Sequence, residues 1–296
     1  MKPLFVALPG NMELATALAS SLDAEVATTN IRQFPDGESY LRFDTALEGR
    51  DVVIVCTLNR PDALAMPLFF AADACRDLGA ASIGLVAPYL AYMRQDERFQ
   101  PGEAVTSRYF STMISRAFDW MLCVDPHLHR FARLDALYSI PSQIVHASES
   151  IAVWVASNVV NPVLVGPDSE SEQWVAAVAT SADLPYVILE KVRSGDRDVA
   201  VSGWQSQNWV NHTPVVLDDI ISTARTMIET VEVLLRADMA APVCIGIHGV
   251  FADNAHDDLL RAGAQQVVTC NTIPHMSNGI DVTALLAGAI ATMLRT

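Results

Sequence analysis

The chain is 296 residues long, and a single hydrophobic core rarely spans so many residues, so we expect two domains. Its net charge of −15 argues against nucleic acid as a partner, because binding a phosphate backbone requires clustered lysines and arginines. No apolar run reaches the ~18–20 residues of a membrane span, and the N-terminus shows no signal-peptide pattern. We therefore expect a soluble cytoplasmic protein that binds neither nucleic acid nor membranes.

Apolar runs of strand length alternate with helical patterns along the whole chain. The predicted strands are residues 4–8, 52–57, 83–87, 120–124, 163–165, 186–189, 215–217, 243–247 and 267–270. The predicted helices are residues 11–21, 62–78, 104–118, 149–157, 170–182, 226–237 and 254–262, with caps expected at Asn11, Ser148, Ser169 and Asp253. Most strands are apolar throughout, which is typical of strands covered on both faces. The pattern predicts two doubly wound α/β domains with mainly parallel sheets.

A stretch without clear periodicity at residues 138–143, which contains Pro141, is the expected domain boundary. We therefore predict an N-terminal domain at residues 1–142 and a C-terminal domain at residues 143–281. Residues 282–296 have a helical pattern, and we expect this segment to pack back on the first domain. Ligands of such sheets gather at the carboxyl ends of the strands, so polar residues at strand ends are the candidates for function.

The clearest group of polar residues follows the predicted strand at 215–217. Two adjacent carboxylates, Asp218 and Asp219, are followed by a hydroxyl-rich loop that opens a helix. Neighbouring carboxylates accept hydrogen bonds from two adjacent sugar hydroxyls, and the N–H groups at a helix start bind phosphate. One ligand that satisfies both halves is a pentose with a 5-phosphate. The alternative is that Asp219 or Ser222 only caps the helix while Asp218 is solvated.

This segment, residues 214–226, resembles the phosphoribosyl-binding motif shared by phosphoribosyltransferases and ribose-phosphate diphosphokinases. The resemblance assigns ribose 5-phosphate binding to Asp218, Asp219, Ser222, Thr223, Arg225 and Thr226. The chain departs from the motif at Arg225, where the family has its second glycine. A glycine there allows close backbone approach to the phosphate, often with positive φ. We expect the Arg225 guanidinium to replace part of that N–H cradle.

Motifs in the N-terminal half distinguish between these two families. Phe34-Pro35-Asp36-Gly37-Glu38, Pro88-Tyr89 followed by Arg94-Gln95-Asp96, Val124-Asp125-Pro126-His127 and Gly166-Pro167-Asp168 resemble the diphosphokinases in the same order. Phosphoribosyltransferases lack the N-terminal set. The resemblance implies two domains of phosphoribosyltransferase-like type, and an ATP site at Phe34, Asp36, Glu38, Arg94, Gln95 and Asp96. It also implies a homo-oligomer, because the first loop reaches the nucleotide of a neighbouring subunit. The plainer alternatives are a β-turn at 35–37 and a solvated charged loop at 94–98.

Two further pairs complete the predicted site. His127 and Asp168 each follow a strand, in different halves, and are the expected Mg²⁺ anchors, with Asp125 and His129 as weaker candidates. A lone histidine is more often structural. Lys191 and Arg193 match the family's catalytic Lys-x-Arg pair, and cations around a transferring phosphoryl group stabilise its charge. The alternative for Lys191 is a surface salt bridge with Glu190.

The sequence thus predicts an enzyme that transfers diphosphate from Mg-ATP to C1 of ribose 5-phosphate, giving phosphoribosyl diphosphate and AMP. Two other functions stay open at this point. One is a phosphoribosyltransferase that consumes phosphoribosyl diphosphate. The other is a catalytically silent regulatory homologue, which the altered phosphate loop favours mildly.

Overall fold

The structure is a computed structural model that describes residues 1–128, 130–131, 133–194, 198–202, 209 and 211–295. The chain divides into two compact units: Met1–Val145 together with Thr283–Thr296 (unit 1), and His146–Val282 (unit 2). The expected boundary at 142/143 lies three residues earlier. The difference arises because Ser142–Val145 forms a strand that pairs with Trp120–Val124 and so belongs to the sheet of unit 1.

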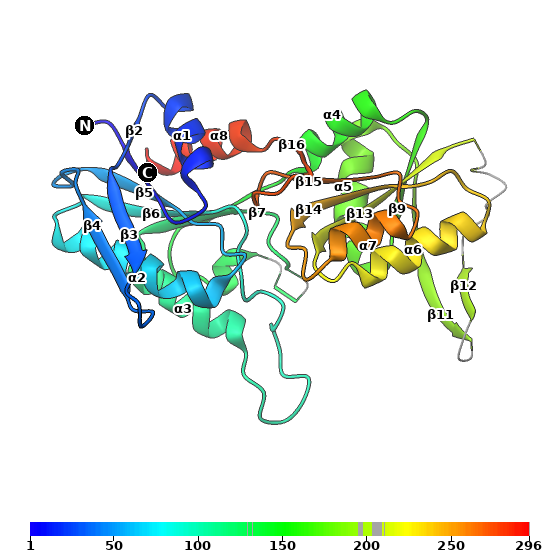
Figure 1. Ribbon diagram of the computed structural model, residues 1–296, viewed down its shortest axis with the longest axis horizontal. Helices are drawn as coiled ribbons and strands as arrows, with labels where there is room; N and C mark the ends of the chain where they lie inside the picture. The colour runs from blue at the N-terminus through cyan, green and yellow to red at the C-terminus, as the bar shows by residue number, and fades with distance from the viewer. Residues whose placement is uncertain (129, 132, 195–197, 203–208, 210, 296) are drawn as a thin grey trace. The chain divides into compact units, whose positions relative to one another are not determined.

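Unit 1 contains a six-stranded parallel sheet in the order β2-β1-β5-β6-β7-β8. Its strands are β1 (Leu4–Ala7), β2 (Glu25–Val26), β5 (Asp51–Val55), β6 (Ser82–Ala87), β7 (Trp120–Val124) and β8 (Ser142–Val145). Its helices are α1 (Met12–Ser21), α2 (Pro61–Asp77), α3 (Thr106–Ala117), the 3₁₀ turn η1 (Leu134–Ala136) and α8 (Thr283–Met293). The C-terminal helix α8 contacts α1, β7 and β8, and so lies on the sheet of this unit (Figure 1).

Unit 2 contains a second six-stranded parallel sheet in the order β10-β9-β13-β14-β15-β16. Its strands are β9 (Pro162–Gly166), β10 (Tyr186–Ile188), β13 (Thr213–Ile221), β14 (Val243–Gly249), β15 (Gln266–Cys270) and β16 (Asn278–Ile280). Its helices are α4 (Ser148–Asn158), the 3₁₀ turn η2 (Ser169–Ser171), α5 (Glu172–Ala182), α6 (Arg225–Arg236) and α7 (Ala255–Arg261). Helix α6 buries Met227, Val231 and Leu234, a helical spacing that packs one face on the sheet.

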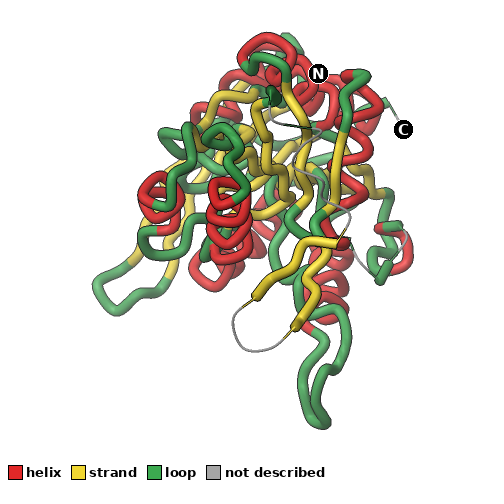
Figure 2. The backbone as a smooth tube through the Cα atoms, turned by 90° about the vertical axis from the view of Figure 1, so that its right-hand side faces the viewer, coloured by secondary structure: helices red, strands yellow, loops and turns green. Residues whose placement is uncertain are grey.

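The two units repeat one topology, although their sequences show no evident repeat. Numbered along each unit, the sheet strands run in the order 2-1-3-4-5-6 in both. Each unit also carries an antiparallel hairpin between its second and third sheet strands: β3 (Thr29–Gln33) with β4 (Ser39–Phe43), and β11 (Glu190–Ser194) with β12 (Asp198–Ser202). The β11–β12 hairpin extends away from the sheet of unit 2 (Figure 2). The predicted pair of doubly wound, parallel-sheet domains is confirmed.

The strand order marks one edge of each sheet as the candidate ligand-binding edge. In a doubly wound sheet the order reverses between the first and third strands, and a crevice opens at their carboxyl ends. This switch point lies between β1 and β5 in unit 1, and between β9 and β13 in unit 2. In unit 2, Asp168 is the second residue after β9, and Asp218 and Asp219 lie near the end of β13.

Three of the expected helix caps differ from the structure by one residue. The caps are Ala147, Asp168 and Asn254, where the sequence suggested Ser148, Ser169 and Asp253. At Asp168 the reason is plain, because its carboxylate accepts hydrogen bonds from the backbone N–H groups of the next turn. Among the helices of the described residues, none has the length and apolar character needed to cross a membrane.

Candidate active site

The site in unit 2 is built on the end of strand β13. Asp219 is buried and Asp218 is half-buried, and the backbone N–H of Asp219 donates to Asp218 Oδ1 at 3.0 Å. Strand β13 lies between β9 and β14, so both carboxylates belong to the interior of the sheet's carboxyl edge. The predicted strand at residues 215–217 is confirmed, but β13 continues to Ile221, so the two aspartates lie within the strand near its end and not in the loop after it.

Three carboxylates gather at this edge. The pKa of Asp218 is raised from 3.8 to about 8, first by burial and then by the nearby charges of Asp219 and Asp168. A raised pKa means that the ionised form lacks sufficient compensation from hydrogen-bond donors or cations. A cation, or the hydroxyl donors of a sugar, would supply that compensation. The local electrostatics therefore favour a ligand that brings positive charge or donated hydrogen bonds to Asp218.

Asp168 is placed by a tight turn after β9. Its Oδ1 accepts hydrogen bonds from the backbone N–H groups of Glu170 at 3.0 Å and Ser171 at 3.2 Å, and the Ser171 hydroxyl donates to the Asp168 carbonyl. A Cβ on Gly166 would lie 2.6 Å from Ser171 Oγ, so only glycine lets this turn close against the strand. One carboxylate oxygen of Asp168, Oδ1, thus caps this turn. The charge of the same carboxylate is near enough to Asp218 to raise its pKa.

The predicted phosphate loop leads from β13 into α6. Ala224 has φ of 58°, in the left-handed region, and its carbonyl accepts from the N–H of Ile228 at 2.8 Å. Arg225 is not among the residues with positive φ and is the first residue of α6, with an exposed side chain. The left-handed turn of this loop is therefore made by Ala224, one residue before Arg225.

The rest of this loop is arranged as a helix start. Ser222 and Thr226 are half-buried and Thr223 is exposed. The residue at the N-cap of α6 is Ala224, whose side chain cannot accept a hydrogen bond, and the first N–H groups of a helix have no acceptor within the helix itself. Such a terminus attracts anions through its N–H groups and its helix dipole. The loop has the local structure that the phosphate prediction requires.

The first predicted ATP motif forms the tip of the β3–β4 hairpin. The N–H of Gly37 donates to the Phe34 carbonyl at 2.9 Å, and the N–H of Glu38 donates to Asp36 Oδ1 at 3.3 Å. The β-turn alternative is therefore also correct as structure. Phe34, Asp36 and Glu38 are all exposed at this tip. Arg32 belongs to none of the predicted motifs, yet it lies beside this tip. Its guanidinium lies 4.7 Å from the Phe34 ring centre and 4.4 Å from that of Tyr40.

The second predicted ATP motif lies on the long loop between β6 and α3. Arg94 is exposed and Gln95 is half-buried, while Asp96 is buried and pairs with Arg130 Nη1 at 2.9 Å. Arg130 also pairs with Glu97 at 2.7 Å. Asp96 therefore holds this loop to the segment after β7, a structural role that the sequence reasoning did not foresee because Arg130 lies outside the motifs.

The predicted metal anchors lie in different units: His127 follows β7 in unit 1, and Asp168 lies in unit 2. His127 is half-buried, Asp125 is buried, and His129 lies outside the described residues. In the described part of the chain, no three His, Cys, Asp or Glu side chains are arranged to hold a metal ion by themselves.

The predicted catalytic pair lies on β11, in the second hairpin. Lys191 is opposite Val201 and Arg193 is opposite Val199 in the antiparallel ladder. The side chains of Lys191 and Arg193 lie outside the described part of the structure. The pair thus lies within a strand of this hairpin.

Comparison with known proteins agrees with this arrangement. Residues 4–117 match the N-terminal domain of ribose phosphate pyrophosphokinase, and residues 135–285 match the phosphoribosyl transferase domain. The ribose-phosphate pyrophosphokinase of Methanopyrus kandleri is 30% identical over 97% of this chain and 98% of its own. That of Methanosarcina acetivorans is 30% identical over 95% of this chain and 97% of its own.

A solved structure shows the same fold over the full length. The crystal structure of phosphoribosylpyrophosphate synthetase from Mycobacterium smegmatis is similar with a TM-score of 0.86 and 25% identity, and 99% of each chain is covered. The resemblance found from the motifs, and the phosphoribosyltransferase-like type of the domains, are confirmed. This chain is a member of the ribose-phosphate pyrophosphokinase family.

Proposed function

We propose that this enzyme transfers the diphosphate group of Mg-ATP to the C1 hydroxyl of ribose 5-phosphate. The C1 oxygen forms a bond to the β-phosphorus, the bond between that phosphorus and the α–β bridging oxygen breaks, and AMP leaves. The hydroxyl proton is released and phosphoribosyl diphosphate is formed. The observation that carries the proposal is the Asp218–Asp219 pair near the end of β13, followed by a hydroxyl-bearing loop that leads into helix α6, in a chain of this family.

The ribose side of the site follows from unit 2. Asp218 and Asp219 accept hydrogen bonds from the two ring hydroxyls, which relieves the poor compensation that raises the pKa of Asp218. The N–H groups at the start of α6 and the hydroxyls of Ser222, Thr223 and Thr226 hold the 5-phosphate. Arg225 adds a permanent cation at the first position of the helix, where an exposed guanidinium reaches a phosphate oxygen.

The residues that we propose to bind ATP lie in unit 1, and three of them form the exposed tip of the β3–β4 hairpin. Phe34 stacks on the adenine while Asp36 and Glu38 accept from nucleotide donors, and Arg94, Gln95 and Asp96 belong to the phosphate-binding loop. The buried Asp96 acts there by fixing Arg130 and the loop. Exposure of all three hairpin residues supports a homo-oligomer in which this tip serves the nucleotide of a neighbouring subunit.

Magnesium fits the residues present. Mg²⁺ prefers oxygen ligands and keeps several waters, so one or two carboxylates beside substrate phosphates suffice. Asp168, with His127 in the other unit, is the expected anchor, and the crowded carboxylates around Asp218 suit a cation. When bound, Mg²⁺ neutralises phosphate charge and helps to orient ATP. Lys191 and Arg193 stabilise the charge that spreads over the transferring oxygens, and most of the acceleration comes from alignment.

A labelling assay tests the reaction directly. The protein is incubated with Mg²⁺, ribose 5-phosphate and ATP labelled at the β-phosphorus, and the products are separated. We expect AMP and labelled phosphoribosyl diphosphate in equal amounts, and neither product when ribose 5-phosphate is omitted. The matched control is the Asp218→Asn, Asp219→Asn double variant, which should form neither. Formation of ADP, or AMP release without the sugar, would contradict the proposal.

A further inference from the structure

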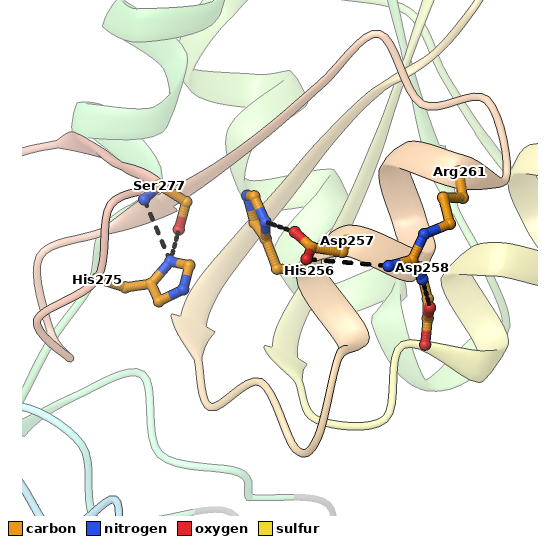
Figure 3. Close-up of polar contacts among 6 residues, drawn as sticks. All are labelled: His256, Asp257, Asp258, Arg261, His275 and Ser277. Carbon is orange, nitrogen blue, oxygen red and sulfur yellow. Dashed lines mark hydrogen bonds and ion pairs between the residues drawn. The ribbon is translucent and has the colours of Figure 1, made fainter.

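Three aromatic rings pack edge-on or tilted against one another at the carboxyl edge of unit 2, beside the loop at residues 222–224 that leads into α6, here called the ribose-phosphate loop. Phe251 lies in the loop after β14, His256 on α7, and His275 in the loop after β15. The ring centre of Phe251 lies 4.5 Å from that of His275 and 5.4 Å from that of His256, and the two imidazoles are 5.1 Å apart. Figure 3 shows the two imidazoles side by side between these elements. We call Phe251, His256 and His275 the ring cluster.

The hydrogen bonds of His275 fix its protonation state. Its Nδ1 accepts from the backbone N–H of Ser277 at 3.2 Å and lies 2.8 Å from the Ser277 hydroxyl (Figure 3). That hydroxyl in turn contacts Thr269 Oγ1 at 2.8 Å inside the core. A backbone N–H only donates, so Nδ1 carries no proton here and the neutral ring bears its proton on Nε2.

A second proton on His275 would disrupt this arrangement. The new Nδ1–H would face the N–H of Ser277, and the positive ring would lie against His256. Burial, followed by the charge of His256, lowers the pKa of His275, while Asp257 on α7 raises it. Asp257 is itself bound by His256 Nδ1 at 3.1 Å and faces Arg261 at 4.0 Å, which weakens its support for a charged His275.

The ring cluster is joined to the ribose-phosphate loop through the backbone of residue 251. The N–H of Phe251 donates to the Ile221 carbonyl at 2.9 Å, and that of Ala252 donates to the Ser222 carbonyl at 3.0 Å. A Cβ on Gly249 would lie 2.6 Å from the Phe251 ring, so the chain is shaped to admit this ring. Phe251 has φ of 43° and Asp253 has φ of 54°. Non-glycine residues hold such a backbone only when surrounding contacts impose it.

We propose that the ring cluster is a pH-sensitive support for the ribose-phosphate loop, with His275 as a positioning residue whose protonation frees Phe251 and loosens its hold on Ile221 and Ser222. The support is in place above the pH at which His275 takes up its second proton and is lost below it. When the support is lost, affinity for the sugar phosphate falls, and this step rests on the proposed function. The support of Ile221 and Ser222 by Phe251 and Ala252 does not depend on the proposed function.

Amide hydrogen exchange of the ligand-free protein tests the support. Peptides covering residues 249–254 are followed between pH 7.5 and 5.5, and each rate is corrected for the intrinsic pH dependence of exchange. We expect protection to fall at least about fivefold on acidification, because these amides then open locally. His275→Gln, which cannot take up the proton, should show pH-independent protection. The matched control, His212→Gln, replaces a half-buried histidine just before β13 and should respond as the wild type does.

A second variant keeps the test decisive if His275→Gln does not fold. His256→Gln removes the charge that opposes protonation of His275, so the loss of protection should begin at higher pH. The proposal is overturned if protection in the wild type does not change with pH. It is also overturned if His275→Gln or His256→Gln shows the same pH response as the wild type. A His212→Gln variant that loses the response overturns it as well, since the effect would then not belong to the ring cluster.

Ribose 5-phosphate binding, measured by calorimetry at pH 7.5 and 6.0, separates this inference from the proposed function. Titration of the ligand's own phosphate is common to all variants, so the comparison is the ratio of wild-type to His275→Gln affinity. That ratio should fall at least about threefold at pH 6.0, and an unchanged ratio refutes a role in binding. If no variant binds the sugar at either pH, the proposed function fails while the exchange result still decides on the support.

Discussion

Replacing Asp218 by asparagine should stabilise the ligand-free protein while destroying its site. Asparagine has nearly the same shape, and its side-chain oxygen keeps the 3.0 Å hydrogen bond from the N–H of Asp219. The substitution removes a charge that burial, Asp219 and Asp168 all disfavour. Functional carboxylates often carry such a cost in stability, because their environment is arranged for the ligand and not for the empty site.

The magnitude follows from the pKa of Asp218, which is raised from 3.8 to about 8. The native state binds this proton more tightly than the unfolded chain does, so stability falls as pH rises between these two values. At ~1.4 kcal/mol per pKa unit, the ceiling near pH 7.5 is about 5 kcal/mol. Asp218 is only half-buried, so solvent screening reduces this, and we expect the variant to be more stable by about 2 kcal/mol.

Urea unfolding at pH 5 and pH 8, with EDTA present to remove cations, measures the effect. The advantage of Asp218→Asn over the wild type should grow from pH 5 to pH 8. Asp238→Asn is the control, because this exposed aspartate lies outside the site and should change stability by less than about 0.5 kcal/mol at either pH. A variant no more stable relative to the wild type at pH 8 than at pH 5 would refute the carboxylate crowding.

Three further predictions concern catalysis and ligand binding. Lys191→Ala should lower kcat by at least ~10²-fold with a smaller change in KM, and comparable turnover would refute its role in the transition state. His127→Ala and Asp168→Asn should each raise the Mg²⁺ concentration for half-maximal rate, and an unchanged titration in both would exclude them as anchors. Arg225→Ala should weaken ribose 5-phosphate binding about 10- to 100-fold with ATP affinity unchanged, whereas tighter binding by Arg225→Gly would show that the guanidinium obstructs the phosphate.

The parallel sheets could be predicted because their strands are buried on both faces and therefore apolar throughout. β5, with the sequence DVVIV, and β7, with WMLCV, cannot be mistaken for exposed segments. The two hairpins could not be predicted in this way. β3 reads TNIRQ and has no buried residue, so neither burial nor alternation identifies it.

Site residues at strand ends could be predicted, and the contacts between loops could not. Asp168 and Asp218 follow apolar runs, and parallel strands bring such positions to one edge. The pairing of Asp96 with Arg130 depends on two loops that meet only in the folded chain. The backbone hydrogen bonds from Phe251 to Ile221 and from Ala252 to Ser222 likewise have no signal in local sequence.

The two units share one topology, so the residues at the switch point, and not the fold, distinguish one unit from the other. In unit 1 the corresponding position, at the carboxyl ends of β1 and β5, is occupied by the buried side chain of Asn11. Its Oδ1 accepts from the N–H of Thr57 at 2.8 Å, and its Nδ2 donates to the carbonyls of Leu8 and Pro9. These bonds satisfy the side chain within the protein, whereas Asp218 in unit 2 is left with a carboxylate poorly compensated by its surroundings. The position after β1 in unit 1 thus carries a polar side chain whose hydrogen bonds are made within the protein, whereas unit 2 carries a carboxylate whose raised pKa favours a ligand that brings positive charge or hydrogen-bond donors.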